Sequence, residues 1–473
     1  MKVLLVVPRY ADRISNVAQT TVGPPLGLAY MAAVLEAKGI EVRILDANAL
    51  ALSDSATVEH IAQGRPDVVG FTAVTPTADQ CGRLADRVRD ALPKSLIVMG
   101  GIHVTALPDD SMDRYESVDL IVRGEADTRF ADILQGFEAG RPFSDFAGVC
   151  YREAGAAICT VPSDQLEDLD SLPFPARHLL PMERYVGPDG GRFTTIIGSR
   201  GCPGRCAYCS VNQSFGGALR SRSPQLVAAE MTECAERFGS RTFGFIDDTF
   251  TTNRDWVIRL CGAINAAGLQ RRANWFCLTR VDRVDPDLLC TMRAAGCFKV
   301  EFGIESGDQA VLDSLGKGTT TAQVLDAFKW ARAAGLQTLA FVMLFPPAET
   351  EASLSATKNL VFKADPDLLQ ASFCTPYPGT ALAAECASRG IPVSDDWSEY
   401  VFLTWPVMDH PRFSRAEMID WQKRLLRAFY FRPRIAARMI SHAISSGSWR
   451  GMLISAWSAL RSLLKPSDQR RAK

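Results

Sequence analysis

The sequence lacks any uninterrupted apolar run long enough to span a bilayer. Its N-terminal apolar stretch, residues 3–7, is too short for the hydrophobic region of a signal peptide and stops at Pro8. The chain also has almost no net charge, because its 52 Lys and Arg nearly balance its 53 Asp and Glu. This balance argues against bulk affinity for nucleic acid. We therefore expect a cytoplasmic globular protein of two or three domains, with no nucleic-acid partner.

A fourth metal ligand is missing from the most informative stretch. Cys202, Cys206 and Cys209 form a CxxxCxxC pattern directly after an apolar run, and the next cysteine, Cys234, lies beyond a helix-like segment. A structural zinc site needs a fourth Cys or His nearby, and a disulfide leaves one of three thiols over, so both are weaker interpretations. A four-iron cluster normally takes four thiolates, so three ligands leave one iron open to a small molecule.

Ten further cysteines are scattered through the chain. We expect free thiols, most of them buried as small hydrophobic side chains, as in a reducing cytoplasm. They are Cys81, Cys150, Cys159, Cys234, Cys261, Cys277, Cys290, Cys297, Cys374 and Cys386.

Residues 1–140 alternate continuous apolar strands with helix-like segments, which predicts an α/β domain with a doubly wound parallel sheet of the Rossmann or flavodoxin-like type. We expect strands at residues 3–7, 42–45, 68–71, 96–99 and 120–122, and helices at 26–38, 78–91 and 129–137. Such sheets bind ligands at the carboxyl ends of their strands. The polar residues and glycines that we expect at this edge are Thr72, Thr75, Gly100, Gly101, His103, Gly124 and Glu125.

Residues 141–190 are rich in acids and prolines, which suits a linker. A second alternating series over residues 191–410 predicts a partial (β/α)6 barrel of the TIM type, with its active site at the carboxyl ends of the strands. We expect its strands at residues 194–198, 242–246, 275–278, 298–302, 338–345 and 368–373. The three cysteines follow the first of these strands, where the active site should lie.

These segments resemble the radical S-adenosylmethionine (SAM) enzymes, and within them the subgroup with an N-terminal cobalamin-binding domain. The triad with Tyr208 before its last cysteine is typical of the family, and the resemblance extends from about residue 2 to about residue 434. Several segments are also similar to the anaerobic magnesium-protoporphyrin IX monomethyl ester cyclase branch. The other segments that carry the resemblance are Pro24-Pro25-Leu26-Gly27-Leu28-Ala29-Tyr30, Gly100-Gly101-Ile102-His103, Arg123-Gly124-Glu125, Asp247-Asp248 and Gly303-Ile304-Glu305-Ser306.

The resemblance implies three cofactors. Cys202, Cys206 and Cys209 would hold a 4Fe-4S cluster whose open iron binds SAM, and cleavage of SAM would give a 5′-deoxyadenosyl radical. Cobalamin would bind at the first sheet, without histidine ligation of cobalt, because the DxHxxG signature is absent and His103 lies in a different setting. The alternative is that His103 is a polar loop residue of a sheet that has lost its cofactor.

The resemblance also implies SAM contacts from polar residues at the barrel strand ends. The candidates are Asp247, Asp248, Arg280, Glu301 and Glu305. Carboxylates could accept hydrogen bonds from the ribose hydroxyls and the ammonium group, whereas the alternative for each residue is a cap or a solvated charge. The family has glycines where Phe345 and Ala348 stand, so the turn beside the adenine must differ here.

Positive charge collects in the predicted helical region 411–473. Between residues 423 and 473, twelve Lys and Arg face the single acid Asp468, and apolar residues including Trp449 and Trp457 recur at helical spacing. A basic amphipathic helix suits the surface of an anionic membrane, so one interpretation is a peripheral contact with the inner face of the membrane. The other is a helix docked on the barrel with a solvated basic face.

With these patterns, the resemblance implies a radical SAM enzyme that functionalises an unactivated carbon of an apolar, lipid or secondary-metabolite substrate. Methyl transfer from cobalamin ranks first and oxidative cyclisation with the same cofactors ranks second. A non-catalytic iron–sulfur or corrinoid sensor or binding protein is the third interpretation. The expected partners are the small-molecule or lipid substrate and a reducing protein such as flavodoxin or ferredoxin. The patterns single out no catalytic acid, base or radical residue.

Overall fold

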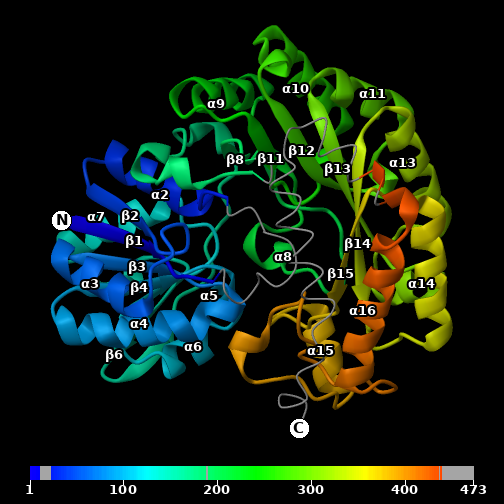
Figure 1. The fold of residues 1–473 in the computed structure, drawn as a ribbon. Helices are drawn as coiled ribbons and strands as arrows, with labels where there is room; N and C mark the ends of the chain where they lie inside the picture. The colour runs from blue at the N-terminus through cyan, green and yellow to red at the C-terminus, as the bar shows by residue number, and fades with distance from the viewer. Residues whose placement is uncertain (11–22, 188–189, 436, 439–473) are drawn as a thin grey trace.

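The fold is built on two sheets that lie side by side, each covered by helices (Figure 1). It is seen in a computed structural model that describes residues 1–10, 23–187, 190–435 and 437–438. Across these residues, every helix is too short or too polar to cross a bilayer. The tail beyond residue 438, with Trp449 and Trp457, lies outside the described residues.

The first sheet confirms the predicted doubly wound fold. Its five parallel strands, in spatial order, are β2 (Glu41–Asp46), β1 (Lys2–Val7), β3 (Val68–Thr72), β4 (Leu96–Gly100) and β5 (Leu120–Val122). Helices α2 (Leu26–Ala37) and α7 (Arg129–Glu138) pack on one face, and α3 (Asp54–Gly64) and α4 (Ala78–Ala91) pack on the other. Helix α3 was not predicted, because it buries only Thr57, Val58 and Ile61 and shows little apolar periodicity.

The predicted linker differs from a simple connector. Strands β6 (Val149–Glu153) and β7 (Ala156–Cys159) form a hairpin that extends the first sheet with two antiparallel strands. Its two-residue turn places Ala154 at φ +49° and Gly155 at φ +85°. An alanine is unusual in the first position of such a turn, which is why the sequence pattern did not reveal the hairpin.

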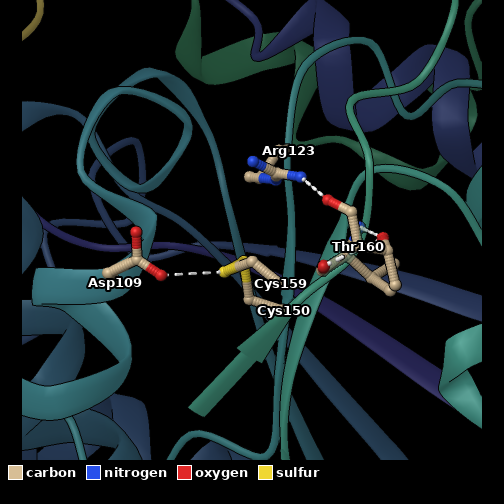
Figure 2. Close-up of a disulfide and its surroundings, with 6 residues drawn as sticks. Asp109, Arg123, Cys150, Cys159 and Thr160 are labelled. Carbon is tan, nitrogen blue, oxygen red and sulfur yellow. Dashed lines mark hydrogen bonds between the residues drawn. A yellow bond between two sulfur atoms is a disulfide. The ribbon is translucent and has the colours of Figure 1, made fainter.

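Two cysteines of this hairpin are paired. Cys150 and Cys159 lie opposite one another on β6 and β7 and form a disulfide (Figure 2). The prediction that both are free thiols was therefore wrong. Antiparallel pairing brings directly opposed side chains together, and ten scattered cysteines gave no sign of that pairing while the hairpin was unrecognised. The other eight outside the triad are free.

The second sheet confirms the predicted partial barrel. All six strands are parallel and stay in sequence order, namely β8 (Phe193–Ile196), β11 (Thr242–Phe245), β12 (Asn274–Arg280), β13 (Cys297–Glu305), β14 (Gln337–Leu344) and β15 (Leu368–Phe373). The outer helices are α9 (Pro224–Arg237), α10 (Arg254–Ala266), α11 (Pro286–Ala294), α13 (Thr321–Ala333) and α14 (Glu351–Ala364). Helix α16 (Arg415–Tyr430) packs beside β15 at the open edge (Figure 1).

A buried ion-pair network joins the two halves of the molecule. Glu230 of α9 is fully buried and lies 2.7 Å from Arg177 and 2.5 Å from Arg222. The Arg222 guanidinium also donates to the hydroxyl of Tyr30 on α2, at 3.0 Å. Removing one member of such a network leaves the remaining charges buried and uncompensated.

We expect Glu230→Ala to destabilise the protein by about 3–5 kcal/mol, because two buried arginines lose their shared carboxylate. The matched control is Glu233→Ala on the same helix, which removes an exposed ion pair with Arg237 and should cost below about 1 kcal/mol. Thermal unfolding of the full chain measures both. Equal melting temperatures for the two variants would contradict the role given to the network.

Candidate functional site

The three cysteines lie on one loop at the carboxyl end of β8. The loop runs from the short strand β9 (Ser199–Arg200) to helix α8 (Val211–Ser214), and its thiols are free and partly exposed. A Cβ atom added to Gly204 would lie 3.3 Å from Cys202 Sγ and 3.9 Å from Cys206 Sγ, so both sulfurs border this glycine. Burial, together with smaller contributions from the neighbouring Cys206 and Cys202, raises the pKa of Cys209 to about 11. The three thiols are therefore close enough to interact, as ligands of one cluster must be.

Several polar groups surround these sulfurs. Cys202 Sγ lies 3.4 Å from Thr249 Oγ1 and accepts from the amide of Gly204 at 3.4 Å, and Cys206 Sγ accepts from Arg280 Nη1 at 3.8 Å. Across the described residues, no three Cys, His, Asp or Glu side chains are close enough to hold a single metal ion. The donor set of three clustered thiols fits an iron–sulfur cluster with one open iron.

Two of the predicted SAM ligands form hydrogen bonds with the residues that lead into the cysteine loop. Asp247 is buried and accepts hydrogen bonds from the Gly198 amide, at 3.0 Å, and the Ser199 hydroxyl, at 2.6 Å. Asp248 accepts from the Gly201 amide at 3.2 Å. Burial raises the pKa of each carboxyl to about 6. These acids hold the backbone that leads into the cysteine loop. The charge of Asp248 also lies near enough to Cys209 to raise the pKa of its thiol.

The other predicted SAM ligands also have partners within the protein. Glu305 is buried at the carboxyl end of β13 and lies 2.7 Å from Lys317 Nζ. Arg280, at the end of β12, donates to Asp282 at 2.9 Å. Glu301 lies deeper in the barrel and pairs with Lys299 at 2.7 Å. Arg280 and Glu305 are thus brought to the cysteine loop, whereas Glu301 is not.

The turn after β14 shows how the chain replaces a glycine. Phe345 adopts a left-handed φ of +64°, which a glycine would reach without strain. Its ring is fully buried and packs against Phe373, Phe413 and Trp421. Burial of this aromatic cluster offsets the strain of the left-handed backbone.

The predicted cobalamin edge is a close-packed end of the first sheet. Gly101 has φ +107°, and a Cβ there would lie 2.5 Å from the carbonyl oxygen of Ala73, so only glycine fits. Thr72 ends β3, and Thr75 is buried in the following 3₁₀ turn. Gly124 follows β5, has φ +68° and donates its amide to Thr105. Backbone exposed by glycines at strand ends suits a large, flat ligand.

His103 follows Gly101 on the short helix α5 (Ile102–Ala106). Its side chain is buried, and neither ring nitrogen has a hydrogen-bond partner within the protein. Burial lowers its pKa to about 4, so the imidazole is neutral. The ring of Trp397 stands edge-on to it at 5.0 Å. Unpartnered buried nitrogens at this edge fit a ligand with polar groups.

Glu125, predicted at the cobalamin edge, is bound by two arginines of the protein itself. Its carboxylate lies 3.0 Å from Arg200 and 2.6 Å from Arg220, which stand on either side of the cysteine loop in the sequence, and it also accepts from the Leu166 amide. Asp127 binds Arg200 through two hydrogen bonds, of 2.8 and 3.0 Å. Glu125 therefore links the end of β5 to the residues on either side of the cysteine loop.

The two predicted binding edges meet. Helix α5, which carries His103, contacts α8, which directly follows the cysteine loop. Figure 1 shows α5 and α8 between the two sheets. Sequence patterns missed two residues here, Lys317 and Trp397, because each lies in a loop far from the motifs that it contacts.

Comparisons with known proteins agree with this geometry. Residues 16–134 match the B12 binding domain and residues 196–361 match the Radical SAM superfamily. An uncharacterized methyltransferase of Pyrococcus horikoshii is 33% identical over 440 residues, 93% of this chain and 95% of that protein. The anaerobic magnesium-protoporphyrin IX monomethyl ester cyclase of Cereibacter sphaeroides is 29% identical over 440 residues, 91% of this chain and 71% of the cyclase.

Two solved enzymes share the fold. The radical SAM methyltransferase TsrM from Kitasatospora setae, solved with cobalamin and a [4Fe-4S] cluster, has a TM-score of 0.69 at 19% identity and covers 82% of this chain and 78% of its own. The cobalamin-dependent SAM radical enzyme OxsB, solved with aqua-cobalamin and SAM, has a TM-score of 0.74 at 15% identity. The match covers 96% of this chain and 72% of the OxsB chain. The predicted fold and the three predicted cofactors are confirmed. The chain belongs to the cobalamin-dependent radical SAM methyltransferase family.

Proposed function

We propose that this enzyme methylates an unactivated carbon of an apolar small molecule held between its two sheets. The observation that carries the proposal is the contact between α5, at the cobalamin edge, and α8, after the cysteine loop. A methyl donor and a radical source must reach the same carbon, and this contact brings their two binding edges together. Enzymes of this superfamily act on small-molecule substrates and need a reductant.

When bound, a [4Fe-4S] cluster supplies the electron that splits SAM and methylcobalamin supplies the methyl group. Cys202, Cys206 and Cys209 hold the cluster. Asp248, Arg280 and Glu305 surround the triad and are the SAM-facing groups of the proposal. Asp247 and Glu301, predicted in the same role, are better explained as supports of the loop and of the barrel interior.

For cobalamin, the proposed contacts are at the strand ends of the first sheet. They are Thr72, Thr75, Gly100, Gly101, His103 and Gly124, without His103 as a cobalt ligand. The Trp397 ring already covers the imidazole, which supports a packing or hydrogen-bonding role for His103. Glu125 contributes indirectly, by fixing the edge relative to the cysteine loop.

An apolar substrate is supported by the barrel interior. Strand residues alternate between faces, and Cys277, Ala340 and Val342 belong to the core beneath the outer helices. Their neighbours Leu278, Leu339 and Phe341 therefore face the interior, where they are only partly buried. This face can contact apolar parts of a substrate while the surrounding strands exclude water.

The second candidate is oxidative cyclisation. It is favoured by the cyclase relatives, which match 91% of this chain at 29% identity in the Cereibacter sphaeroides protein. The same cofactors and the same enclosed site serve either outcome, since both begin with removal of a hydrogen atom. A flavodoxin or ferredoxin is the proposed electron donor in both.

We also propose that the basic C-terminal region touches an anionic membrane surface. Arg432, Arg434 and Arg438 converge on Asp365, at 3.6, 3.3 and 2.7 Å, and Arg438 also lies 3.6 Å from Asp367, so three arginines face two carboxylates and positive charge is left in excess. Phe431, next to them, is 61% exposed. An exposed aromatic ring beside several arginines suits a phospholipid headgroup layer.

The first test is anaerobic purification with cobalamin supplied, followed by measurement of iron, sulfide and corrinoid per chain. We expect both cofactors in the wild type, with dithionite-dependent formation of 5′-deoxyadenosine. Cys206→Ala should lose cleavage, whereas the control Cys290→Ala, at an exposed free thiol on α11, should keep it. A cluster without corrinoid would remove methylcobalamin from the proposal, and zinc in place of iron would overturn it.

Product mass separates methyl transfer from cyclisation. With SAM deuterated in its methyl group, methyl transfer adds a labelled methyl to the substrate, whereas cyclisation removes hydrogens and adds no label. We expect the label in the product. An unlabelled product that has lost hydrogen would establish the cyclase reaction instead.

Membrane contact is tested by co-sedimentation with vesicles. We expect the protein to sediment with vesicles that contain phosphatidylserine and not with pure phosphatidylcholine. Arg434→Glu, at a guanidinium that is 70% exposed, should weaken binding severalfold, since each charge near such a surface contributes about 1 kcal/mol. The control Arg237→Glu makes the same charge change on α9. Equal loss in both variants would indicate only a general charge effect and would contradict the proposal.

A further inference from the structure

Lys317 is a buried lysine whose side chain contacts Tyr208 of the cysteine loop. It lies in the loop between α12 (Gln309–Ser314) and α13, and its side chain is 6% exposed. Its ammonium group lies 2.7 Å from Glu305 Oε1 and 3.3 Å from the hydroxyl of Tyr208. A lysine this deeply buried needs such partners to remain charged.

Tyr208 connects this group to the cluster ligands, because it stands between Cys206 and Cys209 in the sequence. Its hydroxyl donates to the Glu305 carboxylate at 3.0 Å. Glu305 itself has a left-handed φ of +57°. A non-glycine residue keeps this conformation only when its surroundings fix it, and here Lys317 and Tyr208 bind its carboxylate.

The backbone around Lys317 also packs against the cysteine loop. The Leu315 carbonyl accepts from the Ala207 amide at 2.9 Å. Gly316 has φ +62°, and a Cβ there would lie 3.0 Å from the Arg205 carbonyl oxygen. The loop containing Lys317 is therefore packed, backbone against backbone, on the residues between the first and last cysteines.

The Lys317 carbonyl orients a second cation. It accepts from Arg280 Nη2 at 2.7 Å, while the other terminal nitrogen of Arg280 lies 3.8 Å from Cys206 Sγ. Asp282 holds the same guanidinium at 2.9 and 3.0 Å. One residue thus fixes Tyr208 through its side chain and Arg280 through its backbone, and both act on the Cys206 side of the triad.

We propose that Lys317 is a positioning residue that sets the geometry and the charge around Cys206, and with them the reduction potential of the bound cluster. The inference rests on the proposed function. Charges and hydrogen bonds near the sulfurs are among the factors that tune such potentials. Lys317 neutralises Glu305, so its removal leaves a buried negative charge beside the cluster and makes an added electron less favourable.

The test is an anaerobic redox titration of the cluster-loaded full chain, followed by electron paramagnetic resonance without SAM. We expect Lys317→Met to move the midpoint potential to more negative values and to change the spectrum of the reduced cluster. Lys317→Met combined with Glu305→Gln should move the potential back toward that of the wild type, because no uncompensated charge remains. Lys317→Arg, which keeps the charge, should change the potential less than Lys317→Met.

A matched control is Lys299→Met. Lys299 belongs to a Lys–Glu pair of the same 2.7 Å separation on the same barrel, with its partner Glu301 two residues away on β13. The cluster of the Lys299→Met variant should have the same midpoint reduction potential as that of the wild type. An unchanged potential and spectrum in Lys317→Met would overturn the inference, as would the same shift in Lys299→Met.

Loss of folding would not leave the inference undecided. If Lys317→Met does not fold, Lys317→Arg displaces the charged group without removing it, and an unchanged spectrum in this variant would overturn the inference. A wild type that binds no iron would instead defeat the proposed function. A wild type that loads normally beside an unaltered variant defeats only the role of Lys317.

Discussion

The structure depends on the buried ion pairs that Arg200, just before the cysteine loop, makes with acids at the end of β5. Arg200 stands two residues before Cys202 and binds Asp127 through both terminal nitrogens, while one of them also reaches Glu125. These acids directly follow β5, at the cobalamin edge. Buried pairs of this kind add little net stability, but they allow few alternative arrangements. The end of β5 and the cysteine loop are thereby held against one another by side chains that adjoin both.

Local patterns predicted most of the fold. The five parallel strands of the first sheet and the six of the second are continuous apolar runs with amphipathic helices between them, and such runs are recognisable without any distant contact. The three cysteines were predicted for the same reason, since their spacing is local. Helix α3 and the β6–β7 hairpin escaped prediction because their apolar signal is weak or their turn is unusual. The Cys150–Cys159 pairing escaped with the hairpin.

The site was harder to predict than the fold, because residue type shows what a side chain can do and not which partner it meets. Glu125 had the right chemistry for a ligand edge, yet two arginines from about 75 and 95 residues further along the chain bind it. Asp247 had the chemistry of a ribose ligand, yet it accepts backbone amides. Lys317 stands in no motif, and its role depends on contacts with Tyr208 and Glu305 that only the folded barrel creates.

Enclosure of the site explains why the chain returns to its first sheet. A six-stranded barrel is open along one side, so a radical formed at its mouth would meet water unless another part of the chain covered it. The first sheet provides one cover through the contact of α5 with α8. The segment around Trp397 provides a second, since it follows β15 and yet packs on His103 and on the turn at Thr75–Thr77. Segments of the first sheet and of the chain beyond β15 thus close over the same edge, and the Arg200 and Glu230 networks hold the two parts of the chain together.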